Sequence, residues 1–167
     1  MDSQPQAAQD QKPQGFGSIW NNNSWFYEEK NFTKFATGWL QDNIPKLEIT
    51  KDGILVRLYE VKEIEGQASV TIRKQKQIFL FDFELEIYFD AKSVADPSET
   101  CKGKVKVHEF NQDDDEVNMD ITQEKSSDFV SKVKKILNNE MNEAIFKTFQ
   151  GLSKAMRQKD ADEIKLK

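Results

Sequence analysis

The sequence offers few residues that could carry out covalent chemistry. His108 is the only histidine, and it alternates with Lys104 and Lys106 on a predicted strand, where no nucleophile for it to activate is apparent. Cys101 is the only cysteine, and its neighbours give no sign of an activated thiolate. We therefore interpret His108 as a solvated strand residue and Cys101 as an ordinary loop thiol, and we expect no catalytic residues.

Motifs for metals and cofactors are also missing from the sequence. The acidic run Asp113–Glu116 lacks the spaced ligands and the central glycine of a calcium loop, so we interpret it as a solvated turn. No CxxC pair, HExxH pair or glycine-rich phosphate loop occurs, and the chain has only seven glycines. We expect neither a metal nor a cofactor.

A basic cluster is a better candidate for recognition chemistry. Arg73, Lys74 and Lys76 lie within four residues. An arginine offers a planar fork of donors and a lysine a point charge, and both can hold acidic or carbonyl groups through charge-assisted hydrogen bonds. The plainer alternative is that the cluster is only a solvated hairpin turn.

Some apolar residues after this cluster fall on the side of their predicted strands that should face solvent. After it, the inward side of one long strand is filled by Phe79, Phe81, Phe83, Leu85, Ile87 and Phe89. Ile78 and Leu80 have the opposite parity and are predicted to face solvent, and Phe110 falls on the outward parity of its own strand. Exposed apolar residues are common, but these three beside a basic turn indicate a contact surface.

A helix is predicted near the N-terminus. Ser24 is its expected N-cap, because the hydroxyl can accept a hydrogen bond from a free backbone N–H. The apolar stripe of this helix keeps helical spacing and consists of Trp25, Phe32, Phe35, Ala36, Trp39 and Leu40. Pro45 predicts the end of the helix near Asn43, since the residue before a proline avoids the α region.

Alternating apolar and polar residues then predict about four main strands. Residues 54–64 are a candidate strand, and the four stretches that alternate are residues 68–73, 78–89, 104–110 and 117–122. Gly66 is expected to mark a turn. The inward parity changes between Ile72 and Phe79, which predicts a tight turn or a bulge at Arg73–Gln77, and we favour a hairpin turn.

A long amphipathic helix ends the chain. Ser126 or Ser127 is its expected N-cap, and apolar residues keep the 3.6-residue period for about seven turns. Gly151 is expected to end or bend this helix, and the charged residues from Arg157 onward are expected to fray.

These elements define an α+β fold, with an N-terminal helix, an antiparallel sheet of about four main strands and a long C-terminal helix packed on the sheet. We divide the chain into a flexible glutamine-rich tail at residues 1–18, one domain at residues 19–158 and a charged tail at residues 159–167.

Composition limits the partners and the compartment. Lysine plus arginine number 24 and aspartate plus glutamate 29, for a net charge of -5, which argues against nucleic acid as the main partner. No apolar run approaches the roughly 20 residues of a membrane span, and no signal sequence is apparent. We expect a cytoplasmic monomer that binds neither nucleic acid nor membrane.

Two motifs together resemble the N-terminal domain of the family of activators of the heat shock protein 90 ATPase. That family opens with Asn-x-Asn-Asn-Trp-His-Trp, which Asn21, Asn23 and Trp25 match. It also carries Arg-Lys-x-Lys before an aromatic-rich strand, which residues 73–76 match, with Gln75 where glycine is common. The order of elements agrees from about residue 20 to residue 154.

The resemblance implies a co-chaperone that docks on the middle domain of heat shock protein 90 and stimulates its ATPase. It implies that the Arg-Lys-x-Lys turn repositions the chaperone's catalytic loop and that Ile78, Leu80 and Phe110 are docking contacts. The segment with Asn21, Asn23 and Trp25 would tune nucleotide handling, although these residues could simply cap the helix and fill the core. The chain would be either a single-domain relative or part of a two-domain activator.

Two other classes of protein stay open on the residues alone. A curved sheet covered by a long helix could bind a lipid or another hydrophobic ligand. A small enzyme would need a cleft with perturbed titratable groups.

Overall fold

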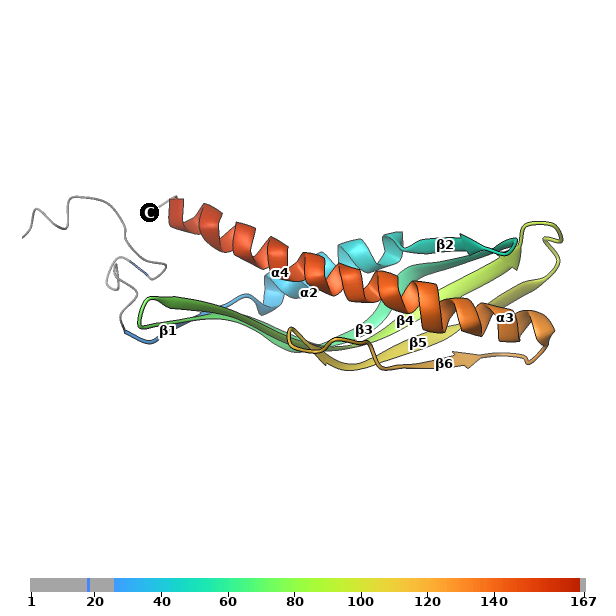
Figure 1. Ribbon diagram of the computed structural model, residues 1–167, viewed down its shortest axis with the longest axis horizontal. Helices are drawn as coiled ribbons and strands as arrows, with labels where there is room; N and C mark the ends of the chain where they lie inside the picture. Colours follow the sequence, from blue (N-terminus) through green and yellow to red (C-terminus); the bar gives the residue numbers. More distant parts are fainter. Residues whose placement is uncertain (1–17, 19–25, 166–167) are drawn as a thin grey trace, which may run out of the picture.

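The computed structural model describes Ser18 and residues 26–165, and it has the predicted α+β fold. One antiparallel sheet runs the length of an elongated molecule, and the helices lie along one face of the sheet (Figure 1). Its strands are β1 (Glu28–Asn31), β2 (Glu48–Lys51), β3 (Ile54–Arg73), β4 (Lys76–Ser93), β5 (Thr100–Asn111) and β6 (Met119–Gln123). The order is β1-β3-β4-β5-β6, and β2 pairs with the start of β3.

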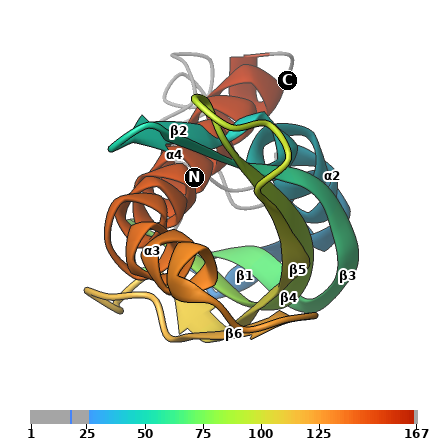
Figure 2. The same ribbon diagram turned by 90° about the vertical axis from the view of Figure 1, so that its right-hand side faces the viewer.

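The core lies between the concave face of the sheet and the helices. Seen from its end, the sheet curls around them (Figure 2). The inward row of β4 is buried as predicted, and Phe81 stacks against Phe149 of the final helix with ring centroids 5.7 Å apart. This face would line a cavity for a hydrophobic ligand, but side chains of the helices pack against it.

The first helix begins later than predicted. α2 (Thr33–Asn43) is preceded by β1, which pairs with Ser69–Ile72 of β3. The predicted start at Ser24 is therefore wrong, because the residues just before Phe32 form a strand of the sheet. Ser24 itself lies outside the described residues. The N-cap position is Phe32, and Asn31 just before it accepts a hydrogen bond from the Thr33 N–H at 2.8 Å through its Oδ1. A 3₁₀ turn, η2 (Ile44–Lys46), follows, so the predicted end near Asn43 is confirmed.

The predicted turn at Gly66 is wrong, because β3 is a single strand of 20 residues. Gly66 has φ 147°, and a Cβ there would lie 2.0 Å from the backbone oxygen of Asp82 on β4. Glycine is thus needed for the close approach of two strands rather than for a reversal of the chain.

The predicted hairpin turn after Arg73 is confirmed. Arg73 pairs with Lys76, and the two residues between them, Lys74 and Gln75, have φ 50° and 65°. A two-residue connection with positive φ at both positions matches the twist of the strands, and it is usually occupied by Asn-Gly or Asp-Gly. Lys74 and Gln75 both carry a Cβ, which makes that conformation sterically unfavourable.

We expect Gln75→Gly to raise the free energy of unfolding by roughly 0.5–1 kcal/mol, because glycine adopts positive φ without the Cβ clash. Urea denaturation monitored by circular dichroism would measure the change. Gln67→Gly is the matched control, since Gln67 lies in β3 and glycine in a strand is destabilising. A loss of stability in Gln75→Gly would contradict the account of strain in the turn.

The final helix is continuous and longer than predicted. It comprises α3 (Asp128–Ile136), a π-helical turn η3 (Leu137–Met141) and α4 (Asn142–Lys165). Ser127 is the N-cap, and its Oγ accepts from the Val130 N–H at 3.2 Å.

Gly151 does not end the helix; a Cβ there would lie 3.1 Å from the Trp39 ring. The expected fraying after Arg157 is also wrong, because the helix buries Asp160. Among the described residues, no helix is long and apolar enough to cross a membrane.

Candidate partner-binding surface

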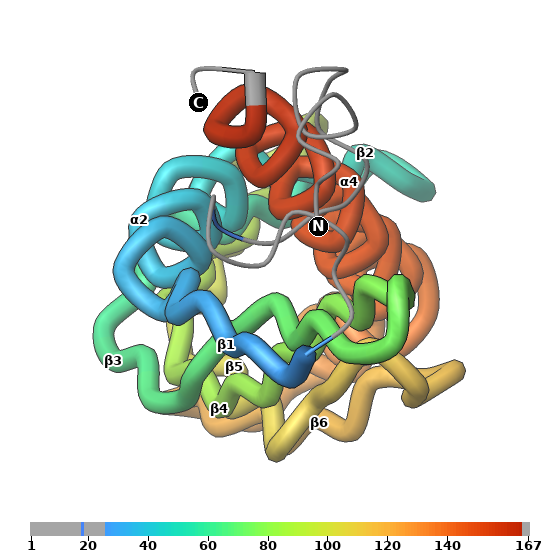
Figure 3. The backbone as a smooth tube through the Cα atoms, turned by 90° about the vertical axis from the view of Figure 1, so that its left-hand side faces the viewer, coloured from blue at the N-terminus to red at the C-terminus, as the bar shows by residue number. Residues whose placement is uncertain are grey.

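The β3–β4 hairpin extends beyond β5 and β6, while β1 pairs with its β3 side. β4 pairs with β5 only from Asp82 onward, so residues 76–81 pair with β3 alone. We call residues 67–82 the hairpin arm. It lies at the end of the molecule where α4 ends (Figures 1 and 3).

The convex face of the hairpin arm carries the apolar residues that the parity predicted. Ile78 is 50% exposed and Leu80 37% exposed. Along β4 they lie between Lys76, next to the turn, and Asp82, where β5 begins to pair. This face therefore runs from basic through apolar to acidic.

The basic side chains of the turn are available to a partner. Arg73, Lys74 and Lys76 are exposed, and none of them forms an ion pair with a residue that the structure describes. The middle of the convex face is different, because its charges neutralise one another. There the Lys104 Nζ lies 3.1 Å from the Glu86 Oε1, and this contact lowers the pKa of Glu86.

The predicted exposure of Phe110 is wrong. The register between β4 and β5 shifts from Phe83↔Phe110 to Leu85↔Val107, so a bulge inserts one extra residue into β5. The bulge reverses the parity of everything after it. Phe110 is 3% exposed, and its ring stacks on Phe149 with centroids 4.5 Å apart. It belongs to the core beneath the hairpin arm.

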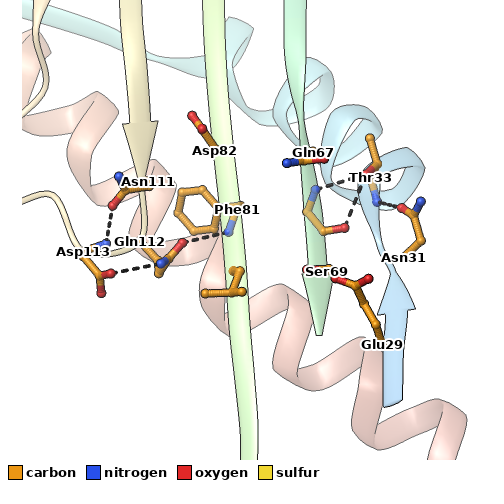
Figure 4. A pocket seen from close by; sticks show the side chains of 12 residues that line it. Glu29, Asn31, Thr33, Gln67, Ser69, Phe81, Asp82, Asn111, Gln112 and Asp113 are labelled. Carbon is orange, nitrogen blue, oxygen red and sulfur yellow. Dashed lines mark hydrogen bonds between the residues drawn. The ribbon is translucent and has the colours of Figure 1, made fainter. Parts of the chain in front are cut away.

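A polar groove lies beside Leu80 (Figure 4). It has a volume of about 400 Å³, and the residues that line it come from β1, the start of α2, β3, β4, the end of β5 and the turn after β5. Between two of its lining residues, the Gln112 Oε1 accepts a hydrogen bond from the Phe81 N–H at 2.8 Å. The sequence analysis missed this groove because its walls come together only through strand pairing.

A buried carboxylate anchors the hairpin arm to α4 near the turn of the arm. Asp160 of α4 is fully buried, its Oδ1 lies 2.8 Å from the Lys30 Nζ of β1, and its Oδ2 accepts a hydrogen bond from the Gln77 Nε2 of β4. One side chain thus joins the end of α4 to two strands. The sequence analysis had assigned Asp160 to a charged tail, since nothing local marks it as buried.

We expect Asp160→Asn to lower the free energy of unfolding by about 2 kcal/mol, because it replaces hydrogen bonds to a charged acceptor with weaker ones and removes the ion pair with Lys30. Chemical denaturation would measure the loss. Asp162→Asn is the matched control, since Asp162 is exposed on the same helix. Equal stability of the two variants would show that the buried pair contributes nothing.

The residues considered for covalent chemistry do not form a site. Cys101 lies on β5 rather than in a loop, it is buried, and burial raises its pKa. The His108 Nε2 lies 2.7 Å from the Asp120 Oδ2 on the convex face. Within the described part of the chain, no cluster of metal-ligating side chains is found. Asn21, Asn23 and Trp25 lie outside the described residues.

Fold and surface together define an α+β module with one curved antiparallel sheet, helices on its concave face and a charged hairpin arm at one end. The family described as "Activator of Hsp90 ATPase, N-terminal" matches residues 29–160. The chain belongs to this family, and the matched region includes the whole hairpin arm.

Individual relatives are distant. An uncharacterized protein of Schizosaccharomyces pombe is 24% identical over 149 residues, which are 87% of this chain and 44% of that protein. The bovine "Activator of 90 kDa heat shock protein ATPase homolog 2" is 24% identical over 103 residues, or 59% of this chain and 39% of that protein. The chain thus spans less than half the length of these curated relatives.

Solved structures share the fold. The crystal structure of Aha-1 from Plasmodium falciparum superposes with a TM-score of 0.67 at 22% identity, covering 81% of this chain and 91% of that one. The human Aha1 N-terminal domain superposes with a TM-score of 0.62 at 16% identity, covering 77% of this chain and 94% of that one.

Proposed function

We propose that this protein is a co-chaperone that binds the middle domain of Hsp90 and stimulates its ATPase. The observation that carries the proposal is the family match over residues 29–160. The names of the bovine and mouse relatives, activators of the 90 kDa heat shock protein ATPase, support it. In this proposal the protein is an activator of another protein's ATPase and not itself an enzyme, and it acts as a monomer in the cytoplasm.

The hairpin arm provides two kinds of contact for such a role. Ile78 and Leu80 supply apolar area that can be desolvated at the centre of an interface. Arg73, Lys74 and Lys76 can hold acidic or carbonyl groups of the catalytic loop of Hsp90 through charge-assisted hydrogen bonds.

Activation then requires only a modest shift in the conformational equilibrium of the catalytic loop of Hsp90. Stabilising one conformation of the catalytic loop by about 1.4 kcal/mol raises its population relative to the alternatives about tenfold. In the same proposal, the segment with Asn21, Asn23 and Trp25 tunes how Hsp90 handles its nucleotide. Docking should weaken as salt increases to the extent that exposed charges contribute to it.

We expect Ile78→Asp to weaken binding to the Hsp90 middle domain by about tenfold or more, because a charge would be desolvated at the centre of the interface without a partner. Isothermal titration calorimetry with the purified middle domain would measure this. Val94→Asp is the matched control, because Val94 is 61% exposed and lies outside the hairpin arm. Binding of Ile78→Asp as tight as that of the control would contradict the proposed docking surface.

A further inference from the structure

The hairpin arm has a free backbone edge. Ala68 and Phe81 face each other across β3 and β4, yet both direct their backbone groups away from each other. The Ala68 N–H donates to the Thr33 Oγ1 at 3.0 Å, and its oxygen accepts from the Phe32 N–H at 2.8 Å. The Phe81 N–H donates to the Gln112 side chain on the opposite side.

Antiparallel pairing extends this pattern along the hairpin arm. Hydrogen-bonded and non-hydrogen-bonded pairs alternate, so Val70↔Phe79 and Ile72↔Gln77 are also non-hydrogen-bonded pairs. The backbone N–H and C=O groups of Phe79 and Gln77 therefore point away from β3. On that side β5 has already ended, and no strand that the structure describes pairs with them.

The structure shows what satisfies the backbone N–H of Phe81, the residue at which this unpaired edge begins. At Phe81, the side chain of Gln112 takes the place of the missing strand. Beyond it, Gln77 and Phe79 offer the row of unpaired backbone groups that lets another chain add a strand. This edge is directly beside the exposed Ile78 and Leu80.

We propose that an extended segment of the partner adds to residues 77–81 as an antiparallel strand, continuing the direction of β5. The inference rests on the proposed function for the identity of the partner, Hsp90. The segment would carry a basic residue toward its N-terminal end, beside Asp82, and an acidic residue toward its C-terminal end, beside Lys76. Apolar side chains between these ends would cover Ile78 and Leu80.

The charges of the hairpin arm favour a partner segment over a second copy of this chain as the strand that adds to this edge. A second copy paired antiparallel on the same edge would place Asp82 opposite Lys76, but Arg73 and Lys74 of each copy would still lack counter-charges among the described residues of the hairpin arm. A partner segment with more than one acidic residue at its C-terminal end would neutralise all three cations.

Amide hydrogen exchange of the ¹⁵N-labelled protein, with and without the Hsp90 middle domain, tests the proposal. In the free protein, Ile78 and Leu80 amides should be protected by β3, whereas Gln77 and Phe79 amides should exchange faster. In the complex, we expect exchange at Gln77 and Phe79 to slow by about tenfold or more. Protected and fast-exchanging amides would then no longer alternate along residues 77–80.

The other outcomes separate the inference from the proposed function. A complex in which Gln77 and Phe79 still exchange as fast as in the free protein would overturn strand addition while leaving the co-chaperone role intact. Absence of any complex would overturn both. Protection of these two amides in the free protein that rises with its concentration would assign the edge to a second copy.

A pair of charge variants tests the polarity of the added strand. Lys76→Asp alone should weaken binding, and adding Asp82→Lys should weaken it further, by about threefold or more, because the double variant reverses the order of charges along the arm. If only net charge mattered, the second substitution would restore binding, and that restoration would overturn the proposed polarity.

Discussion

Replacing Lys74 with glutamate is expected to lower the maximal stimulation of the Hsp90 ATPase by about tenfold or more while changing the affinity for the middle domain by less than about threefold. Lys74 lies at the tip of the hairpin turn, held there at φ 50°, and not in the apolar centre formed by Ile78 and Leu80. Its charge can thus act on the catalytic loop of Hsp90 without contributing much desolvated area. ATPase turnover at saturating protein, together with calorimetry, would separate the two effects.

Lys132→Glu is the control for this prediction. It makes the same change of charge at an exposed position of α3, at the opposite end of the molecule from the hairpin arm (Figure 1). Near-normal stimulation by Lys74→Glu would remove the proposal that the turn repositions the catalytic loop. An equal loss in both variants would mean that only overall charge matters.

Truncation of Phe110 to alanine is expected to lower the free energy of unfolding by about 3–5 kcal/mol, because it removes a buried aromatic ring and leaves a cavity. The ring lies among Phe81, Phe146 and Phe149, with centroids 6.2, 5.9 and 4.5 Å away. Urea denaturation would measure the loss. Any weakening of docking should follow from the disturbed support of the hairpin arm rather than from a lost contact.

Phe110→Leu distinguishes the core role of Phe110 from the docking role that the sequence analysis assigned to it. Leucine keeps most of the apolar volume, so this variant should be destabilised less and should bind the middle domain normally. If Phe110→Ala were as stable as the unsubstituted protein yet bound weakly, Phe110 would be a docking contact and its buried placement would be contradicted.

The strongest patterns in the sequence predicted the structure correctly. The inward row from Phe79 to Phe89, the exposure of Ile78 and Leu80, the hairpin after Arg73 and the cap at Ser127 are all confirmed. Each depends on a period or a parity within one element, and such a signal is fully contained in consecutive residues.

The misplaced features depend on pairing between distant segments. The bulge that buries Phe110 is defined only by the register of β5 against β4, and the strand at Glu28–Asn31 exists only because β3 lies beside it. Asp160 is buried because α4 passes over Lys30 and Gln77, which are far away in the sequence. No local period carries this information, so parity counted along one strand fails after the first bulge.

The most direct test of the central claim is ATPase turnover of purified Hsp90 titrated with this protein, with a chaperone-specific inhibitor to define the background. The account predicts a saturable rise in turnover that is lost with Lys74→Glu and kept with Lys132→Glu. No rise at concentrations where calorimetry shows the middle domain to be saturated would contradict the claim that this protein is an activator.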